Sequence, residues 1–265
     1  MKNVSLRINH FNTVIKKISK LVIIKMISKA KFLDSAVKYS KGIGYQGSLK
    51  SEVDFLIGKD SKPFVLFDIG ANLGNYSLLV ASLFPDSTIY SFEPSKVTFD
   101  LLEANTNLNI QINGVQTAFG EDTKQADLYT DQPGSGMASL YDRDLNAFGI
   151  KFNSSEVVNV QRLDDWVSNN CITPDYIKID VEGSELSVLR GGINTLRNVK
   201  AVQFEFGGTA IDAKTYFKDY SLFNQLNFII YRYTPTGLLK IDTYSESEEI
   251  FEFMNYVAIP DKEFN

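Results

Sequence analysis

A glycine-containing turn follows an apolar run in this sequence, and its residue types suit ligand binding. The turn and the segment after it are Asp68-Ile69-Gly70-Ala71-Asn72-Leu73-Gly74-Asn75-Tyr76-Ser77. Gly70 and Gly74 let the chain turn sharply and let a ligand approach the backbone. Asn72 stands where a dinucleotide fingerprint has its middle glycine, and the carboxylate of Asp68 would repel a pyrophosphate. The turn therefore favours a cationic or zwitterionic ligand.

A second carboxylate, Glu93, lies 19 residues after Gly74 in the sequence Phe92-Glu93-Pro94. At the end of a strand beside such a turn, a carboxylate can accept hydrogen bonds from both hydroxyls of a ribose. The two motifs together indicate an adenosine ligand, and Asp68 favours S-adenosylmethionine over NAD. A tight turn between strand and helix that binds no ligand is the alternative interpretation.

Three further carboxylates, Asp180, Glu182 and Glu205, could support chemistry on an acceptor. Side chains alternate along a strand, so Lys178 and Asp180 share one face of the run from 176 to 180. Asp180 and Glu182 emerge at the carboxyl end of that run, and Glu205 should reach the same edge from a neighbouring strand. A protonated hydroxyl is a poor nucleophile, so a base or a metal must assist its reaction.

Carboxylates are the bases that this domain offers, because the single histidine, His10, lies outside it. Asp180, Glu182 and Glu205 could act as bases, Asp180 being the first choice, or could together hold a divalent cation such as Mg²⁺ or Mn²⁺ through oxygen ligands. Lys178 would then orient or neutralise one carboxylate. The alternative is that Lys178, Asp180 and Glu205 form a structural ion-pair network at the end of the sheet.

The elements that must position these residues alternate between strands and helices, which predicts a doubly wound α/β sheet. Ligands of such sheets bind at the carboxyl ends of the strands. Residues 121–162 interrupt the alternation and predict a β-rich insertion, either a lid over the substrate or a solvated loop. We expect strands at 64–69, 88–92, 115–119, 176–180 and 201–206, late antiparallel strands at 228–234 and 251–259, and helices at 51–57, 75–84, 96–108, 163–169 and 184–196.

In these motifs the sequence resembles the FkbM family of S-adenosylmethionine-dependent methyltransferases. The resemblance runs from about Phe64 to Ile259 and is carried by Asp68 to Ser77, Phe92-Glu93-Pro94, Arg162-Leu163-Asp164-Asp165-Trp166 and Tyr176 to Gly191. It implies a Rossmann-like sheet with an antiparallel last strand. It also implies methyl transfer to oxygen, commonly on hydroxyls of sugars, other glycans and natural products.

The resemblance further implies which residues hold the cofactor. They would be Asp68, Gly70, Asn72, Gly74 and Ser77 around the methionine portion, Glu93 at the ribose, and Gly120 and Glu121, followed by Asp122, near the adenine. For Glu121 and Asp122 an exposed turn is the alternative, because surface acids in turns are common.

Composition and charge limit the classes of protein to consider. The chain has 265 residues, 44% apolar and 22% charged, which indicates one large globular domain with appendages. One cysteine, Cys171, excludes an internal disulfide, and with one histidine it is too few for a His/Cys zinc site. Residues 1–41 carry ten basic and one acidic side chain, which leaves 17 basic and 31 acidic ones in the rest, a net charge of −14.

That acidic body argues against a nucleic-acid partner, since phosphate binding needs a basic face. An amino-directed nucleic-acid methyltransferase would also be expected to have an Asn/Asp-Pro-Pro-Tyr element after the fourth strand, where this chain has Asp180-Val181-Glu182-Gly183. We therefore expect no nucleic acid among the partners.

The basic leader predicts a helix, because apolar residues recur in it at three- and four-residue steps at Val14, Ile15, Ile18, Leu21, Val22 and Met26. We expect residues 1–50 to form a basic amphipathic extension and residues 51–265 the methyltransferase domain. The helix would either cover part of that domain or contact an anionic membrane surface. Its apolar run Leu21 to Ile24 is far shorter than the roughly 20 residues that cross a bilayer. We expect a cytoplasmic enzyme, peripheral at the inner face of the membrane in the second case.

The function expected from all of this is S-adenosylmethionine-dependent O-methylation of a sugar or glycan hydroxyl, in the assembly of a surface polysaccharide, a glycolipid or a glycosylated metabolite. Three alternatives stay open. They are a methyltransferase that acts on a non-sugar small molecule, a nicotinamide-dependent oxidoreductase on a similar sheet, and a non-catalytic adaptor. Asn72 and Asp68 argue against the nicotinamide cofactor.

Overall fold

The structure is a computed structural model that describes residues 25–58, 62–146 and 149–261. The chain divides into two units between Lys41 and Gly42. In the first unit, residues 25–40 form a helix that carries exposed large apolar side chains, among them Met26 and Phe32. The apolar residues predicted at positions 14–22 lie outside the described part. No helix in the described ranges combines the length and the apolar character needed to cross a membrane.

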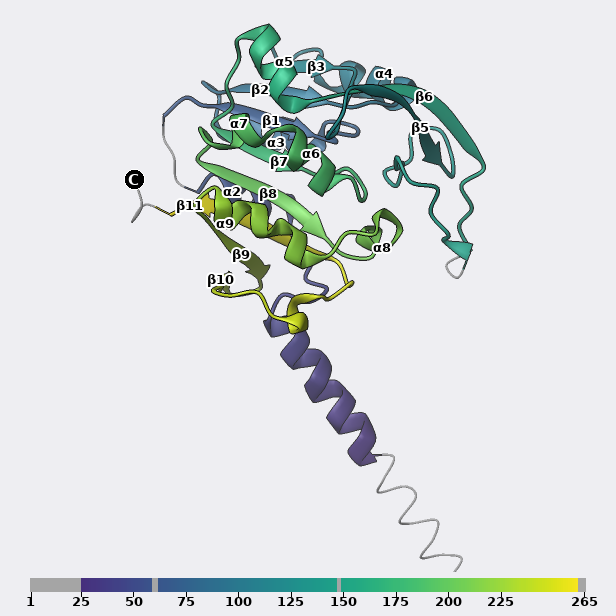
Figure 1. The fold of residues 1–265 in the computed structure, drawn as a ribbon, viewed down its shortest axis with the longest axis vertical. Coiled ribbons are helices and arrows are strands. Elements are labelled where there is room, and N and C mark those ends of the chain that lie inside the picture. Colours follow the sequence, from purple (N-terminus) through teal and green to yellow (C-terminus); the bar gives the residue numbers. More distant parts are fainter. Residues whose placement is uncertain (1–24, 59–61, 147–148, 262–265) are drawn as a thin grey trace, which may run out of the picture. The chain divides into compact units, whose positions relative to one another are not determined.

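The second unit is built on an eight-stranded sheet with the order β10-β9-β11-β8-β7-β1-β2-β3 (Figure 1). Its parallel strands are β1 (Val65–Ile69), β2 (Thr88–Phe92), β3 (Ile112–Val115), β7 (Tyr176–Ile179) and β8 (Ala201–Phe206). The last strand, β11 (Met254–Pro260), runs antiparallel to both β8 and β9 (Phe228–Thr234), and β10 (Gly237–Ile241) is antiparallel to β9. This is the predicted Rossmann-like sheet with an antiparallel last strand, so the fold class is confirmed.

Helices cover both faces of this sheet, which explains why its central strands are continuously apolar. Phe67 and Ile69 of β1 pack in one core with α5 (Leu163–Asn170), α6 (Glu185–Gly191), α7 (Ile193–Leu196) and α9 (Leu222–Gln225). Leu66 faces the other core with α2 (Leu49–Leu56) and α3 (Asn75–Leu83). Helix α4 (Lys96–Thr106) packs near β3. The alternation along β1 thus directs successive side chains into two separate cores.

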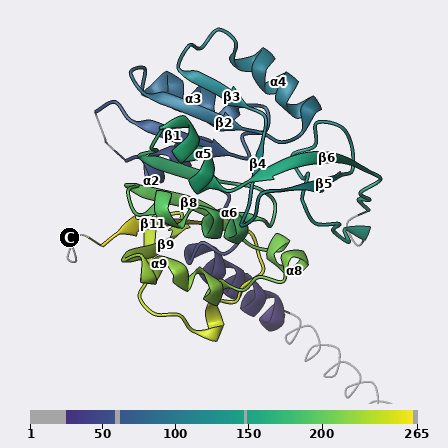
Figure 2. The same ribbon diagram turned by 45° about the horizontal axis from the view of Figure 1, so that its top comes forward.

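The β-rich insertion contains β5 (Lys124–Thr130) and β6 (Ser154–Gln161), which pair antiparallel. With β4 (Ala118–Phe119) they form a second sheet of order β4-β6-β5, which Figure 2 shows beside the carboxyl ends of the central strands. Ser139 makes an isolated antiparallel bridge to Tyr129. The insertion is therefore anchored to the central domain through β4.

The structure differs from the predicted elements in three places. The strand predicted at 115–119 is two strands, β3 and β4, in different sheets. The helix predicted at 184–196 is two helices, α6 and α7, separated at Gly192, whose φ of −119° and ψ of 20° are not helical. Sequence patterns also missed β10 and four short helices, α8 (Thr209–Ala213), η2 (Phe217–Ser221), α9 and η3 (Glu246–Glu248).

Candidate active site

Two cavities open at the carboxyl ends of the parallel strands, where ligands of such sheets bind. The first, here named the apolar cavity, is lined mainly by the β1–α3 turn, the insertion and the β7–α6 loop, with Phe119, Leu128 and Leu140 among its apolar side chains. The second, here named the acidic cavity, is lined by Glu52, Lys178, Asp180, Glu205 and neighbouring neutral residues. Gly70, Asn72 and Asp180 line both. The two cavities therefore adjoin at these three residues.

The turn after β1 forms the boundary between the cavities. Gly70 has a φ of +79°, and a Cβ on it would lie 1.8 Å from the backbone oxygen of Asp180, so this position requires glycine. Asn72 also has a positive φ, 49°. Its side-chain Oδ1 is buried and has no hydrogen-bond partner within the described ranges of the chain. A buried amide oxygen without a partner is costly, which indicates that a ligand completes this site. Gly74, which precedes α3, does not line either cavity.

Glu93 lines the apolar cavity directly after β2, as the ribose prediction requires. Its two carboxylate oxygens accept the backbone N–H groups of Asn72, at 3.1 Å, and of Ser95, at 3.0 Å. Each oxygen keeps a second lone pair for a further donor. Burial raises the pKa of Glu93 to about 7, and the two backbone hydrogen bonds limit this rise. The residue is thus held rigidly and has spare capacity to accept two hydroxyls.

The remaining wall of the apolar cavity is supplied by Phe119 and Leu128, which the sequence analysis did not select. The residues expected at the adenine, Gly120 and Glu121, are not part of this lining. Glu121 instead forms an exposed ion pair with Arg190, at 3.6 Å. A flat heteroaromatic ring is accommodated better by the apolar wall than by an exposed acid.

Asp68 and Ser77, both expected to contact the cofactor, are buried and line neither cavity. The Ser77 hydroxyl donates to Asp68 Oδ2 at 2.7 Å, and Lys178 Nζ lies 3.2 Å from Asp68 Oδ1. The register of β1 and β7 explains this contact, because Asp68 lies directly beside Lys178. Both oxygens of Asp68 are therefore used inside the protein.

Lys178 links the buried Asp68 to the acceptor side of the site. Its Nζ also lies 3.2 Å from Asp180 Oδ2, and it lies over the Tyr76 ring at 5.4 Å from the centroid. Burial alone would lower the pKa of Lys178, but the negative charges of Asp180 and Asp68 outweigh it and raise that pKa. Lys178 is therefore a charged group that fixes the position of Asp180.

The three carboxylates predicted as bases or metal ligands occupy different environments. Asp180 has a side chain that is 45% exposed and lies in both cavities. Burial and the negative charge of Asp180 raise the pKa of Glu182 to about 7, although Arg143 opposes the rise. Burial, followed by Asp180, Glu185 and Glu182, raises the pKa of Glu205 to about 10. Both effects favour the protonated form of Glu205, and Asp180 is the most exposed of the three carboxyl groups.

The predicted metal set is not assembled. Across the residues that the structure describes, no three His, Cys, Asp or Glu side chains come together as a group that could hold a metal ion. Asp180 is engaged by Lys178 and Glu182 by Arg143. The arrangement of Asp180, Glu182 and Glu205 thus does not fit a shared divalent cation.

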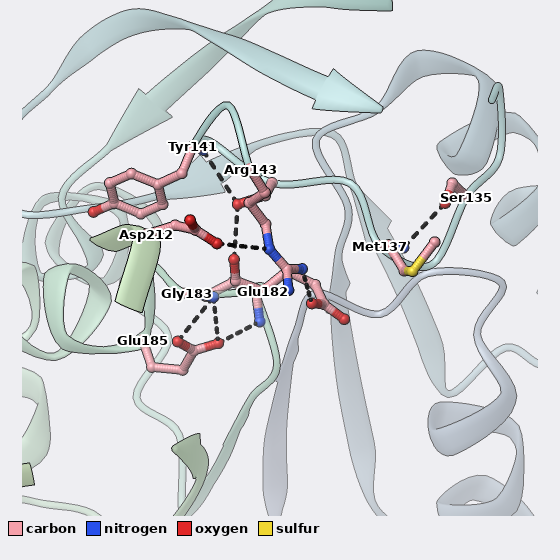
Figure 3. Close-up of polar contacts among 10 residues, drawn as sticks. Ser135, Met137, Tyr141, Arg143, Glu182, Gly183, Glu185 and Asp212 are labelled. Atoms are coloured by element: carbon pink, nitrogen blue, oxygen red, sulfur yellow. Dashed lines mark hydrogen bonds and ion pairs between the residues drawn. The ribbon is translucent and has the colours of Figure 1, made fainter. Parts of the chain in front are cut away.

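Arg143, in the insertion, joins three segments around Glu182 (Figure 3). Its Nη1 donates to Glu182 Oε2 at 2.9 Å, and its Nε donates to Asp212 Oδ2 of α8 at 3.3 Å. The Ser139 hydroxyl donates to the Glu182 backbone oxygen at 2.7 Å. The Arg143 side chain is 10% exposed. The sequence analysis missed Arg143 and Asp212, because no motif connects them to Glu182.

The buried side chain of Glu185 supports the loop between β7 and α6. Its carboxylate accepts the backbone N–H groups of Val181, at 3.1 Å, and Gly183, at 3.1 and 3.2 Å (Figure 3). Burial raises the pKa of Glu185 to about 7, against the effect of these hydrogen bonds. The loop after β7, in which Glu182 has a φ of 53°, is therefore held by hydrogen bonds on two sides.

The sheet order, the turn after β1 and the carboxylate after β2 define the class of α/β methyltransferases. A family model described as the methyltransferase FkbM domain matches residues 68–254, which is more than half of the chain. The chain therefore belongs to the FkbM methyltransferase family, as its motifs indicated. This result decides against the nicotinamide-dependent and adaptor alternatives.

Among solved structures, a precorrin-6y C5,15-methyltransferase from Geobacter metallireducens is similar to this chain. It is 11% identical with a TM-score of 0.47, and the match covers 83% of this chain and 92% of that chain.

Named relatives are similar over 54–59% of this chain. Methyltransferase 1 of Beauveria bassiana is 31% identical over 54% of this chain and 68% of its own length. The hexuronic acid methyltransferase AglP of Haloferax volcanii is 26% identical over 59% of this chain and 63% of its own length. The 2-O-methyltransferase NoeI of Sinorhizobium fredii is 26% identical over 54% and 63%, respectively. The chain thus spans about two thirds of the length of these relatives.

The cofactor of this methyltransferase is S-adenosylmethionine, as predicted. The residues of the apolar cavity fit it. Glu93 has free acceptor capacity, Asn72 has a buried oxygen without a partner, and Phe119 and Leu128 supply an apolar wall. The roles of individual residues toward the cofactor stay predictions.

Proposed function

We propose that this protein is an O-methyltransferase that methylates a hydroxyl group of a sugar or glycan. The names of two relatives support the acceptor class, since one is a hexuronic acid methyltransferase and the other a 2-O-methyltransferase. The observation that carries the proposal is the position of Asp180, which lines both the apolar and the acidic cavity. A carboxylate at that junction can take a proton from an acceptor hydroxyl beside the bound cofactor.

The proposed chemistry divides between the two cavities. When bound, S-adenosylmethionine would supply a methyl group activated by a positively charged sulfur. The bond from that methyl group to sulfur would break as the carbon–oxygen bond forms, and S-adenosylhomocysteine would be the leaving group. Asp180 accepts the proton of the acceptor hydroxyl as the new carbon–oxygen bond forms. Lys178, at 3.2 Å from Asp180 Oδ2, keeps that carboxylate in place. Glu205, with its raised pKa, donates a hydrogen bond to a second hydroxyl of the acceptor.

Cofactor binding is proposed to rest on Glu93 and Asn72. Glu93 accepts the two ribose hydroxyls with its free lone pairs, since its other lone pairs hold Asn72 and Ser95 in place. The Asn72 side-chain oxygen accepts a hydrogen bond from the amino acid portion of the cofactor. Asp68 and Ser77 contribute indirectly, through Lys178 and the packing of the turn.

The proposed division of the chain keeps residues 1–50 as an extension and residues 51–265 as the catalytic domain. Contact of the extension with an anionic membrane surface stays a prediction, and it would be tested by vesicle sedimentation of the full chain and of a chain without residues 1–41. Equal sedimentation of the two would contradict the membrane role.

The function is tested by incubating the full chain with isotopically labelled S-adenosylmethionine and a panel of glycosides, lipid-linked sugars and non-sugar alcohols. Mass spectrometry then locates the methyl group. We expect the label on a sugar oxygen, and loss of this product in Asp180→Asn. Asp86→Asn, an exposed acid in the turn after α3, is the matched control. Label on a nitrogen, a carbon or a non-sugar alcohol, with no labelled sugar, would contradict the proposal.

A further inference from the structure

The lining of the acidic cavity contains more carboxyl groups than basic groups. Glu52, Asp180 and Glu205 contribute carboxyl groups to its lining, and Lys178 is the one basic residue among the described residues that line it. The Lys178 ammonium lies 3.2 Å from both Asp180 and Asp68, so its charge is shared between two carboxylates. No positive charge is left over to bind an anionic acceptor.

Two carboxyl groups of the cavity, Glu52 and Glu205, lie in surroundings that disfavour their ionised forms. The pKa of Glu205 is raised by burial and then by the negative charges of Asp180, Glu185 and Glu182. The pKa of Glu52 is also raised, chiefly by burial, although a hydrogen bond from Gln203 opposes this. An environment that resists the ionisation of its own carboxyl groups also resists the entry of a carboxylate from solution.

The acidic cavity also contains neutral polar groups, one of which lacks a hydrogen-bond partner. Tyr76 lines the acidic cavity and is 3% exposed, and its hydroxyl has no hydrogen-bond partner among the residues that the structure describes. Asn75 and Asn255 add further amide groups to the lining. Hydroxyl and amide groups match the hydroxyls of an uncharged ring, which both donate and accept hydrogen bonds.

We infer that the acidic cavity selects an uncharged polyhydroxyl acceptor, a neutral sugar, and discriminates against sugars that carry a carboxylate. This inference rests on the proposed function and names the substrate class of that same site. It distinguishes this chain from the Haloferax volcanii relative, whose name refers to a hexuronic acid. The physical basis is the lack of a free positive charge, since Asp68 and Asp180 share the single ammonium of Lys178, together with the uncharged hydrogen-bonding groups of the lining.

The experiment compares matched pairs of glycosides that differ only at C6, such as methyl glucoside with methyl glucuronide, and the galacto and manno pairs. Methyl transfer by the full chain is measured by mass spectrometry, and binding of each glycoside by saturation-transfer NMR. We expect a kcat/KM at least tenfold higher for the neutral member of any methylated pair, and binding of the neutral member alone at equal concentration. Equal or better methylation or binding of the uronate overturns the inference.

The two proposals fail differently in this experiment. If no sugar is methylated while a non-sugar alcohol is, the proposed function fails, and the NMR comparison still decides the charge preference. If sugars of both charges are methylated equally, O-methylation of sugars stands and the inference fails. A neutral sugar that neither binds nor reacts when its uronate partner does also overturns the inference.

A charge variant provides an independent check. Glu52→Gln keeps a hydrogen-bonding partner for Gln203 and removes a carboxyl group from the lining. We expect it to lower the ratio of neutral to uronate kcat/KM at least threefold, as should 0.5 M salt, which screens charge beyond a few ångströms. Glu103→Gln, on the exposed face of α4, is the matched control and should leave the ratio unchanged. An unchanged ratio in both Glu52→Gln and high salt contradicts the electrostatic basis.

Discussion

The two cavities meet at Gly70, Asn72 and Asp180 but are built in different ways. In the apolar cavity, the lining carboxylate Glu93 is fixed by two backbone N–H groups. In the acidic cavity, Asp180 is fixed by a buried side chain, Lys178, which is itself held by Asp68. Backbone hydrogen bonds make a site that fits one rigid ligand, whereas paired side-chain charges set the protonation state of a reacting group. The apolar cavity is therefore suited to binding the cofactor, and the acidic cavity is suited to the reaction of the acceptor.

The largest effect is expected from removing the buried cation that supports the acidic cavity. Lys178→Met leaves Asp68 buried without its ion-pair partner, so we expect the free energy of unfolding to fall by about 3–5 kcal/mol. Urea denaturation measures it. The double variant with Asp68→Asn should recover part of this loss, because the uncompensated charge is gone. A Lys178→Met protein as stable as the wild type would show that the pair does not hold this cavity together.

The next effect concerns the carboxylate that the two cavities share. Asp180→Asn keeps the size of the side chain and removes its basicity, so we expect kcat to fall by about 10²–10⁴-fold, the usual contribution of a general base. Calorimetry should give an S-adenosylmethionine Kd within about twofold of the wild type, a change well below the scale of one lost hydrogen bond. Unchanged turnover would remove Asp180 from the reaction, and a large loss of cofactor affinity would assign it to the apolar cavity instead.

The apolar cavity is tested through its own carboxylate. Glu93→Gln weakens the acceptors for the ribose hydroxyls and for the N–H groups of Asn72 and Ser95, so we expect cofactor binding to weaken by about 1.5–3 kcal/mol. Kd from calorimetry measures this, with Glu103→Gln as the control. Cofactor affinity equal to that of the wild type would contradict the ribose assignment.

The pH dependence of cofactor binding follows from the same carboxylate. Burial raises the pKa of Glu93 to about 7 in the free protein, and the ionised form is the one that accepts two hydroxyls. Below pH 7 a proton must leave before the cofactor binds, so affinity should fall by up to about tenfold per pH unit as the pH decreases. Above pH 7 it should level off. Glu93→Gln should flatten this profile, and an unchanged slope in that variant would assign the titration to another group, such as Glu182.

The smallest effect is expected at the ion pairs that close the apolar cavity. Arg143→Gln removes the charge that pairs with Glu182 and Asp212, so the insertion is held less firmly over the β7–α6 loop. We expect S-adenosylmethionine to dissociate about threefold to tenfold faster in stopped-flow measurements, about 1 kcal/mol for partly exposed pairs. Arg197→Gln, at an exposed position, is the control. A dissociation rate equal to that of the wild type would show that the insertion does not retain the cofactor.

Local patterns were sufficient for the parts of the site that lie close in sequence. The apolar runs, the glycines of the turn and the acid that follows β2 predicted the parallel strands, the cofactor class and the positions of Gly70, Asn72 and Glu93 at one cavity. These features depend on local backbone geometry and on the periodicity of apolar residues, which adjacent residues specify. The bounds of β2, β8 and β9 were predicted without error.

Local sequence patterns could not predict contacts between residues on different strands of the sheet. Asp68 was assigned to the cofactor, but strand register places it beside Lys178, 110 residues later in the chain, where it is buried. Glu205 was grouped with Asp180 and Glu182, yet the burial of its side chain and the negative charges around it raise its pKa and favour its protonated form. The partner of Glu182 is Arg143, a residue of the insertion. Each outcome depends on which side chains the fold buries together.

The sequence by itself determined the class of the protein, because a strand, a glycine turn, a helix and an acid after the next strand form one local unit. The tertiary structure alone decided which carboxylate is exposed where the two cavities adjoin. Asp180, Glu182 and Glu205 are chemically similar, and only burial, the shared charge of Lys178 and the ion pair with Arg143 distinguish them. A pKa depends on the field from groups that are distant in sequence, so this assignment required the folded arrangement.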